Sequence, residues 1–252
     1  MGEIVKRLRD GKAVLGGWTL TGHPAVAEIM AEAGFDFIGV DLEHTDISLA
    51  DVHRCALAAK GTACDVLARL PSCDPVLAKR VMDLGAAGII VPSVNSAEEA
   101  ARAVAMALFP PEGSRGASLC RATGYGRRFG EYYREHNEGV AVVVMLEHRD
   151  AVRTADAILA TPGITAALVG PYDLSASMGL AGRLEHPDVI AAQRSVLEAC
   201  RRRGVPAGIH LVSGDPAEIR QRTEEGYRFI ACGIDTLFLR EGCRRALESR
   251  KG

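Results

Sequence analysis

The feature that most constrains the fold is a pattern repeated along the chain, in which a short apolar run is followed by a longer amphipathic segment. The apolar runs have the length of buried strands, and the amphipathic segments have the length of helices. Strands are expected at 13–18, 35–40, 65–68, 88–91, 139–145, 165–169, 206–209 and 229–232. Helices are expected at 23–33, 48–60, 75–84, 96–107, 150–159, 187–203, 216–225 and 236–248.

Strands that alternate with helices predict a parallel sheet covered by helices. The 252 residues contain no Pro-, Gly- or Ser-rich linker, so the pattern predicts a single (β/α)8 TIM barrel that spans 1–252 as one domain. The alternative is a doubly wound open sheet. That fold is expected to carry a glycine-rich dinucleotide turn after an early strand, and the first turn, residues 16–24, does not supply one.

Charge and hydropathy narrow the range of partners. A net charge of −2 gives no reason to expect nucleic acid or a membrane surface as partner. No apolar run reaches the ~20 residues needed to cross a bilayer. Residues 1–10 lack the apolar stretch of a secretory signal. The seven cysteines form no C-x-x-C pair, which indicates reduced thiols in a cytoplasmic protein.

Polar or aromatic side chains stand at the C-terminal ends of several predicted strands, where TIM barrels build their active sites. These residues are Trp18, Asp41, Glu43, His44, Arg69, Glu147, Asp173 and His210. Glu147 and Asp173 end neighbouring strands, so their carboxylates can converge on one Mg²⁺ or Mn²⁺ ion. The alternative for each is a loop acid or a helix N-cap.

The other strand-end residues each have a chemical and a structural interpretation. His44 is a candidate general base, since histidine exchanges protons near neutral pH; alternatively, it bonds a backbone carbonyl. Arg69 is placed to bind a carboxylate or to stabilise an enolate oxygen; alternatively, it bridges barrel acids. Trp18 is expected to form a wall of the pocket, and His210 to be a polar core residue.

The positions of the lysines decide between two ways of activating a carbonyl group. A Schiff-base aldolase needs a lysine inside the barrel. The lysines here lie before the first strand, on predicted helices or at the end of the chain: Lys6, Lys12, Lys60, Lys79 and Lys251. Activation is therefore expected from a metal ion or from arginine and histidine, without a Schiff-base lysine, pyridoxal phosphate or a nucleotide.

Several motifs, in order along nearly the whole chain, resemble those of the HpcH/HpaI family of metal-dependent (class II) pyruvate aldolases. The motifs are 41–44 (DLEH), 69–71 (RLP), 91–100, 110–116, Glu147 and 170–175 (GPYDLS). The family includes aldolases that act on 4-hydroxy-2-oxoheptanedioate and on 2-keto-3-deoxy sugar acids. The resemblance implies reversible cleavage of a 4-hydroxy-2-oxo acid to pyruvate and an aldehyde, through a metal-stabilised pyruvate enolate.

The resemblance also implies a role for individual residues. Glu147 and Asp173 would hold Mg²⁺, Mn²⁺ or Co²⁺, while Arg69 would stabilise the enolate oxygen. His44 would act as the base, and Asp83 matches a family acid that raises the basicity of that histidine. The implied substrate contacts are Trp18, Met145, Gly170, Pro171 and Tyr172.

Two of these positions depart from the family pattern. Met145 stands where the family usually has a glutamine that contacts the substrate, and methionine cannot donate the same hydrogen bonds. Tyr172 stands where the family usually has a small residue. Both changes leave the implied metal ligands intact and alter the implied contacts with the substrate.

The resemblance further implies a homo-hexamer, a trimer of dimers whose last helix, 236–248, is exchanged between subunits; the same helix could pack on its own barrel. The segment 110–137, rich in glycine and arginine, is expected to help to select the aldehyde, or to form a basic loop at a subunit interface. Two alternatives to the aldolase are an acyl-CoA ester lyase of the related superfamily and a non-catalytic barrel that binds oxo acids.

Overall fold

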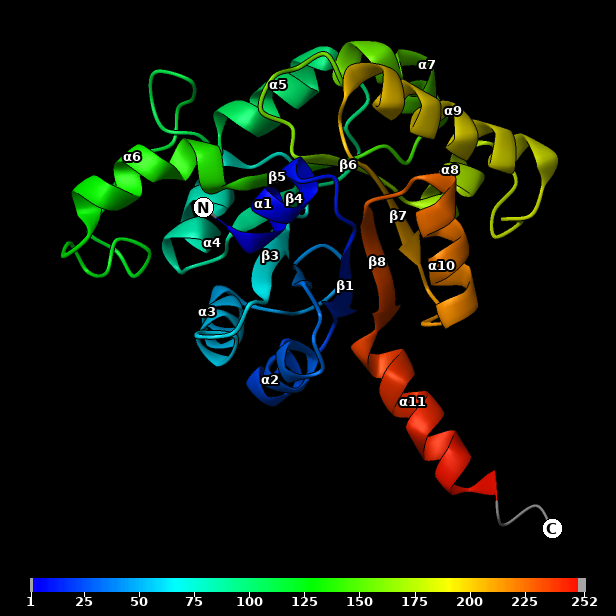
Figure 1. Ribbon diagram of the computed structural model, residues 1–252, viewed down its shortest axis with the longest axis horizontal. Coiled ribbons are helices and arrows are strands. Elements are labelled where there is room, and N and C mark those ends of the chain that lie inside the picture. Colours follow the sequence, from blue (N-terminus) through cyan, green and yellow to red (C-terminus); the bar gives the residue numbers. More distant parts are fainter. Residues whose placement is uncertain (1, 249–252) are drawn as a thin grey trace.

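The protein forms a closed barrel of parallel strands. The computed structural model describes residues 2–248. Each strand pairs with the next along the chain, and the last pairs with the first (Figure 1). The strands are β1 (Val14–Thr19), β2 (Phe37–Asp41), β3 (Asp65–Arg69), β4 (Gly88–Val91), β5 (Ala141–Met145), β6 (Ala166–Val169), β7 (Ala207–Leu211) and β8 (Phe229–Ile234). The predicted TIM barrel is confirmed, and the doubly wound sheet is excluded.

Helices surround the barrel, and every helix predicted from the sequence is present within a few residues of its expected bounds. These helices are α2 (Pro24–Glu32), α3 (Leu49–Ala58), α4 (Pro75–Asp83), α5 (Ala97–Ala105), α7 (Arg149–Ile158), α9 (Pro187–Arg203), α10 (Pro216–Glu225) and α11 (Asp235–Ala246). Many begin at a side chain that accepts a hydrogen bond from the first turn; the carboxylate of Asp74, for example, accepts from the backbone N–H groups of Val76 and Leu77.

Three further helices were not predicted: α1 (Glu3–Arg9), α6 (Phe129–Gly139) and α8 (Pro171–Ser177). Helix α1 buries Ile4, Val5 and Leu8 in the same cluster as the inward side chains of the strands. It therefore closes the N-terminal end of the barrel. Helix α8 begins with a proline, which is favourable at a first helical position, and it carries Asp173 in its first turn.

The inside of the barrel is packed. The rings of Phe37 and Phe229 stack with centroids 4.3 Å apart. A β-carbon at Gly16 would lie 2.4 Å from the ring of Phe37, so the glycine leaves the space that this ring fills. Alternate residues of each strand point outward and pack against the helices.

The segment between α5 and β5 lies at the N-terminal end of the barrel, opposite the site expected from the sequence. The Arg115 side chain is fully buried there, and its Nη2 donates to Oδ1 of Asp83 at 2.7 Å. Its Nη1 donates to the hydroxyl of Tyr132 at 3.0 Å. Burial, with the charge of Arg115, lowers the pKa of His136 to about 4, which keeps that ring neutral.

This placement corrects one expectation. A cavity of about 860 Å³ lies in the same region, lined in part by Arg121, Arg127 and Arg128. It contains none of the predicted site residues. Because a helix that follows a barrel strand returns to the N-terminal end, the segment 110–137 cannot contact an aldehyde at the mouth of its own barrel. The expected role of its arginines in selecting the aldehyde is wrong within a single chain.

Helix α11 extends away from the barrel (Figure 1), and Asp235 is its one buried residue among those described. The carboxylate of Asp235 accepts hydrogen bonds from the hydroxyl of Thr19 at 2.8 Å and from the backbone N–H of Leu20 at 3.0 Å. Farther along, Leu239 on the helix and Leu247 at its C-cap are 68% and 50% exposed. Among the described helices, none has the length and apolar character needed to span a membrane.

Candidate active site

Arg69 is held rigidly at the C-terminal end of β3 by a buried carboxylate. Its Nε donates to Oδ1 of Asp41 at 2.9 Å, and its Nη2 donates to Oδ2 at 2.6 Å. Asp41 ends the neighbouring strand β2 and is fully buried. Burial alone would raise the pKa of Asp41, but the hydrogen bonds and charge of Arg69 more than offset it and hold that pKa below its ordinary value. The guanidinium is therefore fixed in a charged, bidentate pair.

The same carboxylate shapes the turn that follows β2. Oδ1 of Asp41 accepts hydrogen bonds from the backbone N–H of Glu43 at 2.9 Å and of His44 at 3.3 Å. The Glu43 carboxylate consequently lies 3.5 Å from Nη1 of Arg69 and 3.6 Å from Nε2 of His44. The His44 side chain is 61% exposed, so it is open to a molecule bound in the mouth.

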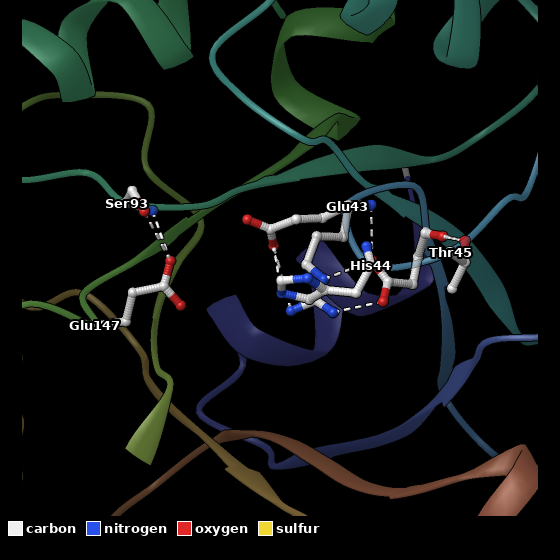
Figure 2. A network of polar contacts seen from close by, with 7 residues as sticks. Glu43, His44, Thr45, Ser93 and Glu147 are labelled. Atoms are coloured by element: carbon white, nitrogen blue, oxygen red, sulfur yellow. Dashed lines mark hydrogen bonds and ion pairs between the residues drawn. The ribbon is translucent and has the colours of Figure 1, made fainter. Parts of the chain in front are cut away.

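Glu147 is held on the other side of the mouth, two residues beyond β5 (Figure 2). Its Oε1 accepts hydrogen bonds from the backbone N–H of Ser93 at 2.7 Å and from the Ser93 hydroxyl at 3.3 Å. Ser93 has a φ of 54°, a left-handed conformation that non-glycine residues rarely adopt. This conformation turns the Ser93 N–H toward Glu147, and backbone strain of this kind tends to cluster at functional sites.

Gly170 leaves space for the second oxygen of Glu147. A β-carbon at Gly170 would lie 2.8 Å from Oε2 of Glu147, closer than real contacts allow. Gly170 is followed by the first turn of α8, where Asp173 is exposed. No described residue donates a hydrogen bond to the Asp173 carboxylate or forms an ion pair with it.

Both carboxylates line a cavity of about 290 Å³ at the mouth of the barrel. The cavity is lined by Glu43, His44, Ser93, Asn95, Glu147, His148, Asp173 and Ser177. Burial raises the pKa of Glu147, and the nearby carboxylates of Asp173 and Glu43 raise it further. The hydrogen bond from the backbone N–H of Ser93 acts in the opposite direction, but the pKa remains above its ordinary value. Negative charge thus gathers in this cavity without a cation in contact with Glu147 or Asp173 among the described residues.

This arrangement fits a divalent cation with an open coordination sphere. The described residues contain no cluster of three or more His, Cys, Asp or Glu side chains able to enclose a metal ion. Two carboxylates with free oxygens suit Mg²⁺ or Mn²⁺, which retain waters and take other ligands from the substrate. A cation there would also relieve the repulsion between Glu147 and Asp173.

The floor of the mouth is largely apolar. Trp18 and Met145 are buried among the inward side chains of the barrel, at 1% and 2% exposure. The guanidinium carbon of Arg69 lies 4.6 Å from the centroid of the Trp18 ring, a cation–π contact. The indole thus supports Arg69 from below, and Met145 brings no hydrogen-bond donor to the floor.

The remaining predicted residues fall into two groups. Pro171 is buried at the first position of α8, and Tyr172 beside it is 50% exposed, so its ring extends from the rim of the mouth. Asp83, by contrast, ends α4 at the opposite end of the barrel, where it pairs with Arg115. Within one chain, the structure does not bring Asp83 to His44.

Three residues of the site were not proposed as functional from the sequence: Asp41, Glu43 and Ser93. Asp41 and Glu43 were noted as strand-end acids, and their place in the motif 41–44 was the available signal. Ser93 carried no comparable signal, because its contribution comes from a backbone N–H and an unusual φ, neither of which depends on a recognisable side chain.

Comparison with known proteins adds independent findings. The family model described as HpcH/HpaI aldolase/citrate lyase matches residues 15–241. The chain is 36% identical to a hydroxypyruvate/pyruvate aldolase from Paraburkholderia phytofirmans, over 97% of this chain and 96% of that protein. It is 35% identical to a 2-dehydro-3,6-dideoxy-6-sulfogluconate aldolase from Pseudomonas putida, over 97% and 95% of the two chains.

A solved structure is similar over its whole length. The crystal structure of an HpcH/HpaI aldolase/citrate lyase family protein from Burkholderia cenocepacia superposes with a TM-score of 0.94. It is 36% identical in sequence, and the match covers 100% of both chains. The likeness therefore includes the barrel and the loops that build the mouth.

Proposed function

This chain belongs to the HpcH/HpaI aldolase/citrate lyase family, and we propose on that basis that it is a divalent-metal-dependent aldolase. It reversibly cleaves a 4-hydroxy-2-oxo acid to pyruvate and an aldehyde. The observation that carries the proposal is the pair of carboxylates, Glu147 and Asp173, which line one cavity and have no cationic partner among residues 2–248. His44 lines the same cavity, and Arg69 lies next to Glu43 at its edge. This is a lyase that acts on a carbon–carbon bond.

Glu147 and Asp173 would hold the metal ion, Mg²⁺, Mn²⁺ or Co²⁺. Bound there, it would polarise the keto group of the substrate and so lower the free energy needed to place negative charge on that oxygen. Ser93 holds one oxygen of Glu147 and leaves the other, next to Gly170, free to act as a ligand.

Arg69 stabilises the oxygen that becomes negative when the carbon–carbon bond breaks. Its Nε and one side of its Nη2 are bound by Asp41, which leaves the remaining N–H groups for the substrate. Because Asp41 and Trp18 fix the guanidinium before the substrate binds, no reorganisation is needed during the reaction.

His44 moves the proton. In the cleavage direction the 4-hydroxyl loses its proton to the base, the bond between C3 and C4 breaks, and C3 of the enolate then takes up a proton to give pyruvate. The exposed imidazole of His44 lies next to Glu43 at the rim of the cavity, where it can exchange protons with substrate and solvent. Gly170, Pro171 and Tyr172 remain proposed contacts of the substrate, with the backbone of Tyr172 next to the substrate carboxylate.

Asp83 can influence His44 only from another copy of the chain, since the two lie at opposite ends of one barrel. We therefore propose a homo-hexamer, a trimer of dimers, in which α11 packs on a neighbouring barrel. The apolar residues that α11 exposes, Leu239 and Leu247 with Phe238, support an exchanged helix. An unpartnered apolar helix face is unfavourable in water, and a second copy would cover it.

Changing Leu239 to glutamate tests this assembly, because a buried charge at an interface is strongly unfavourable. We expect the wild type to have six times the mass of the 26.8 kDa chain and the L239E variant to have a smaller mass with an unchanged far-UV spectrum. Light scattering after size-exclusion chromatography measures both. The matched control is Ile190→Glu, an exposed apolar residue on α9. A monomeric wild type would refute the hexamer.

The test of the activity is to incubate the purified protein with pyruvate, Mn²⁺ and a panel of hydroxyaldehydes. We expect carbon–carbon bond formation that stops when a chelator is added and returns with excess Mn²⁺. Metal-independent turnover would contradict the proposed mechanism. Binding of pyruvate without turnover would instead indicate an oxo-acid-binding barrel.

A further inference from the structure

Two buried polar atoms in the floor of the mouth have no hydrogen-bond partner. They are Nε1 of Trp18 and Nε2 of His210. The two rings meet edge to face, with centroids 5.7 Å apart. Burying a polar group without a partner is unfavourable by about 1–3 kcal/mol, and native proteins seldom leave two such groups together. The pair therefore indicates that a polar group of a bound molecule belongs in the floor.

The barrel holds the two rings in place through small residues. Strand β8 lies between β1 and β7, and its inward residue paired with His210 is Ala231. On the other side, a β-carbon at Gly39 would lie 2.6 Å from the Trp18 ring, so the glycine provides the space for the indole. Ala231 and Gly39 thus leave room for the two rings to meet.

His210 lies close to the groups that perform the proposed reaction. It is the penultimate residue of β7, next to β6, which leads to Asp173, and Arg69 covers the Trp18 ring at 4.6 Å. In the proposed reaction Arg69 contacts the keto oxygen of the substrate; the Trp18 ring lies against Arg69, and the His210 ring lies against Trp18. A substituent on the carbon next to the keto group is therefore the part of the substrate that can approach these two rings.

The chemistry of His210 selects the kind of group it would bind. Burial lowers its pKa to about 4, and the charge of Arg69 contributes in the same direction. A neutral imidazole offers one donor and one acceptor. The ring is partly exposed at the mouth, and a half turn about its Cβ–Cγ bond exchanges its edges without moving the backbone. A hydroxyl group, which both donates and accepts, matches this neutral ring better than a carboxylate.

We propose that His210 is a specificity-determining residue whose imidazole binds a hydroxyl group on the carbon next to the keto group of the substrate. This inference rests on the proposed aldolase function and deepens it. The nucleophilic half is then a 3-hydroxy-2-oxo acid in preference to pyruvate. A site built to bond a hydroxyl discriminates against the analogue that lacks it, because the partner of the hydroxyl is left unpaired.

The test compares two nucleophiles, hydroxypyruvate and pyruvate, with the same acceptor aldehyde and with Mg²⁺. We expect the wild type to have the higher kcat/KM for hydroxypyruvate. Replacing His210 by phenylalanine should lower the hydroxypyruvate-to-pyruvate ratio of kcat/KM by about tenfold or more, the equivalent of one lost hydrogen bond. His210→Gln, which keeps a donor and an acceptor, should retain most of the preference. His53→Phe, the same change at a partly buried histidine on the outer helix α3, should leave the ratio unchanged.

Binding can be measured without turnover, because Trp18 is the one tryptophan of the chain. Its fluorescence should change when either acid is titrated in, with free N-acetyltryptophanamide as the control for absorption by the ligand. The wild type should bind hydroxypyruvate more tightly than pyruvate, and H210F should lose that difference. Thermal unfolding shows whether each variant is folded. If H210F is not folded, the test rests on the preference of the wild type and on the ratio measured for H210Q.

The outcomes separate the subsite from the reaction. The inference is refuted if H210F is folded and active with an unchanged ratio of kcat/KM, or if its affinity falls equally for both acids. His210 would then not bind the hydroxyl group. A wild type that prefers pyruvate refutes it as well. If the wild type turns over neither acid, the proposed function fails, and the fluorescence affinities alone then decide whether His210 distinguishes them.

Discussion

Replacement of Arg69 by lysine is expected to lower kcat by about 10²–10³-fold, the usual effect of removing one oriented donor from an oxygen that gains charge. Lysine keeps the positive charge, so the loss would come from geometry. Its ammonium group cannot form the two parallel hydrogen bonds that Asp41 accepts from Nε and Nη2. It also cannot lie as a flat group on the Trp18 ring, 4.6 Å away in the present structure.

The measurement is steady-state kinetics in the cleavage direction with saturating Mn²⁺. The effect should fall on kcat more than on KM, because the interaction strengthens only as the oxygen becomes negative. Arg54→Lys is a matched control, since Arg54 forms an exposed ion pair with Asp51 on the outer helix α3. If R69K keeps the wild-type kcat, the guanidinium has no role beyond holding Asp41, and the bridging interpretation of Arg69 would be correct.

The fold could be predicted from the sequence because its signal repeats. Each of the strands is a short apolar run bounded by a turn or a helix. An error of a few residues at the predicted end of one strand leaves the alternation of strands and helices unchanged. The missed helices lack that signal. Helix α6 presents mostly polar residues and follows a glycine-rich stretch, and α8 is a single short piece directly after the proline that ends β6.

The candidate site could be predicted in part, for a different reason. Strand ends in a closed barrel converge, so side chains such as Arg69 and Glu147 could be assigned to one mouth by counting strands. The contacts that hold these side chains in place could not be predicted. The Asp41 carboxylate binds four donors from three residues, and the Ser93 N–H reaches Glu147 through an unusual φ. Those contacts depend on three-dimensional positions that no spacing encodes.

Asp83 shows a different limit of prediction from sequence. Its match to a family motif placed it in the catalytic set, yet the helix that carries it returns to the far end of the barrel. A motif reports which residues a family retains and leaves open which copy of the chain they serve. Within one chain the direct partner of Asp83 is Arg115, at 2.7 Å.

The second large effect is expected from Asp173→Ala, which should remove metal binding and activity together. With one of two carboxylate ligands gone, the site loses the charge that attracts a divalent cation. Without the metal ion, the negative charge that develops on the keto oxygen loses several kcal/mol of stabilisation in the transition state. We therefore expect kcat/KM to fall by about 10³-fold or more. Calorimetric titration with Mn²⁺ measures the binding, and the cleavage assay measures the activity. Asp188→Ala is the control, since Asp188 also follows a proline in the first turn of a helix but is exposed on α9.

Thermal unfolding distinguishes a lost ligand from a damaged fold. Asp173 makes no hydrogen bond or ion pair with a described residue, and its charge raises the pKa of Glu147. With chelator present, the variant gains stability because the repulsion of Glu147 is relieved. It loses about 0.3–1 kcal/mol because an acidic side chain is removed from the first turn of a helix, so the two effects oppose each other. The melting temperature should therefore change by no more than about 2–4 °C. With Mn²⁺ present, the wild type should gain stability by mass action and the variant should not. If D173A keeps both its Mn²⁺-dependent stabilisation and its activity, Asp173 is not a metal ligand.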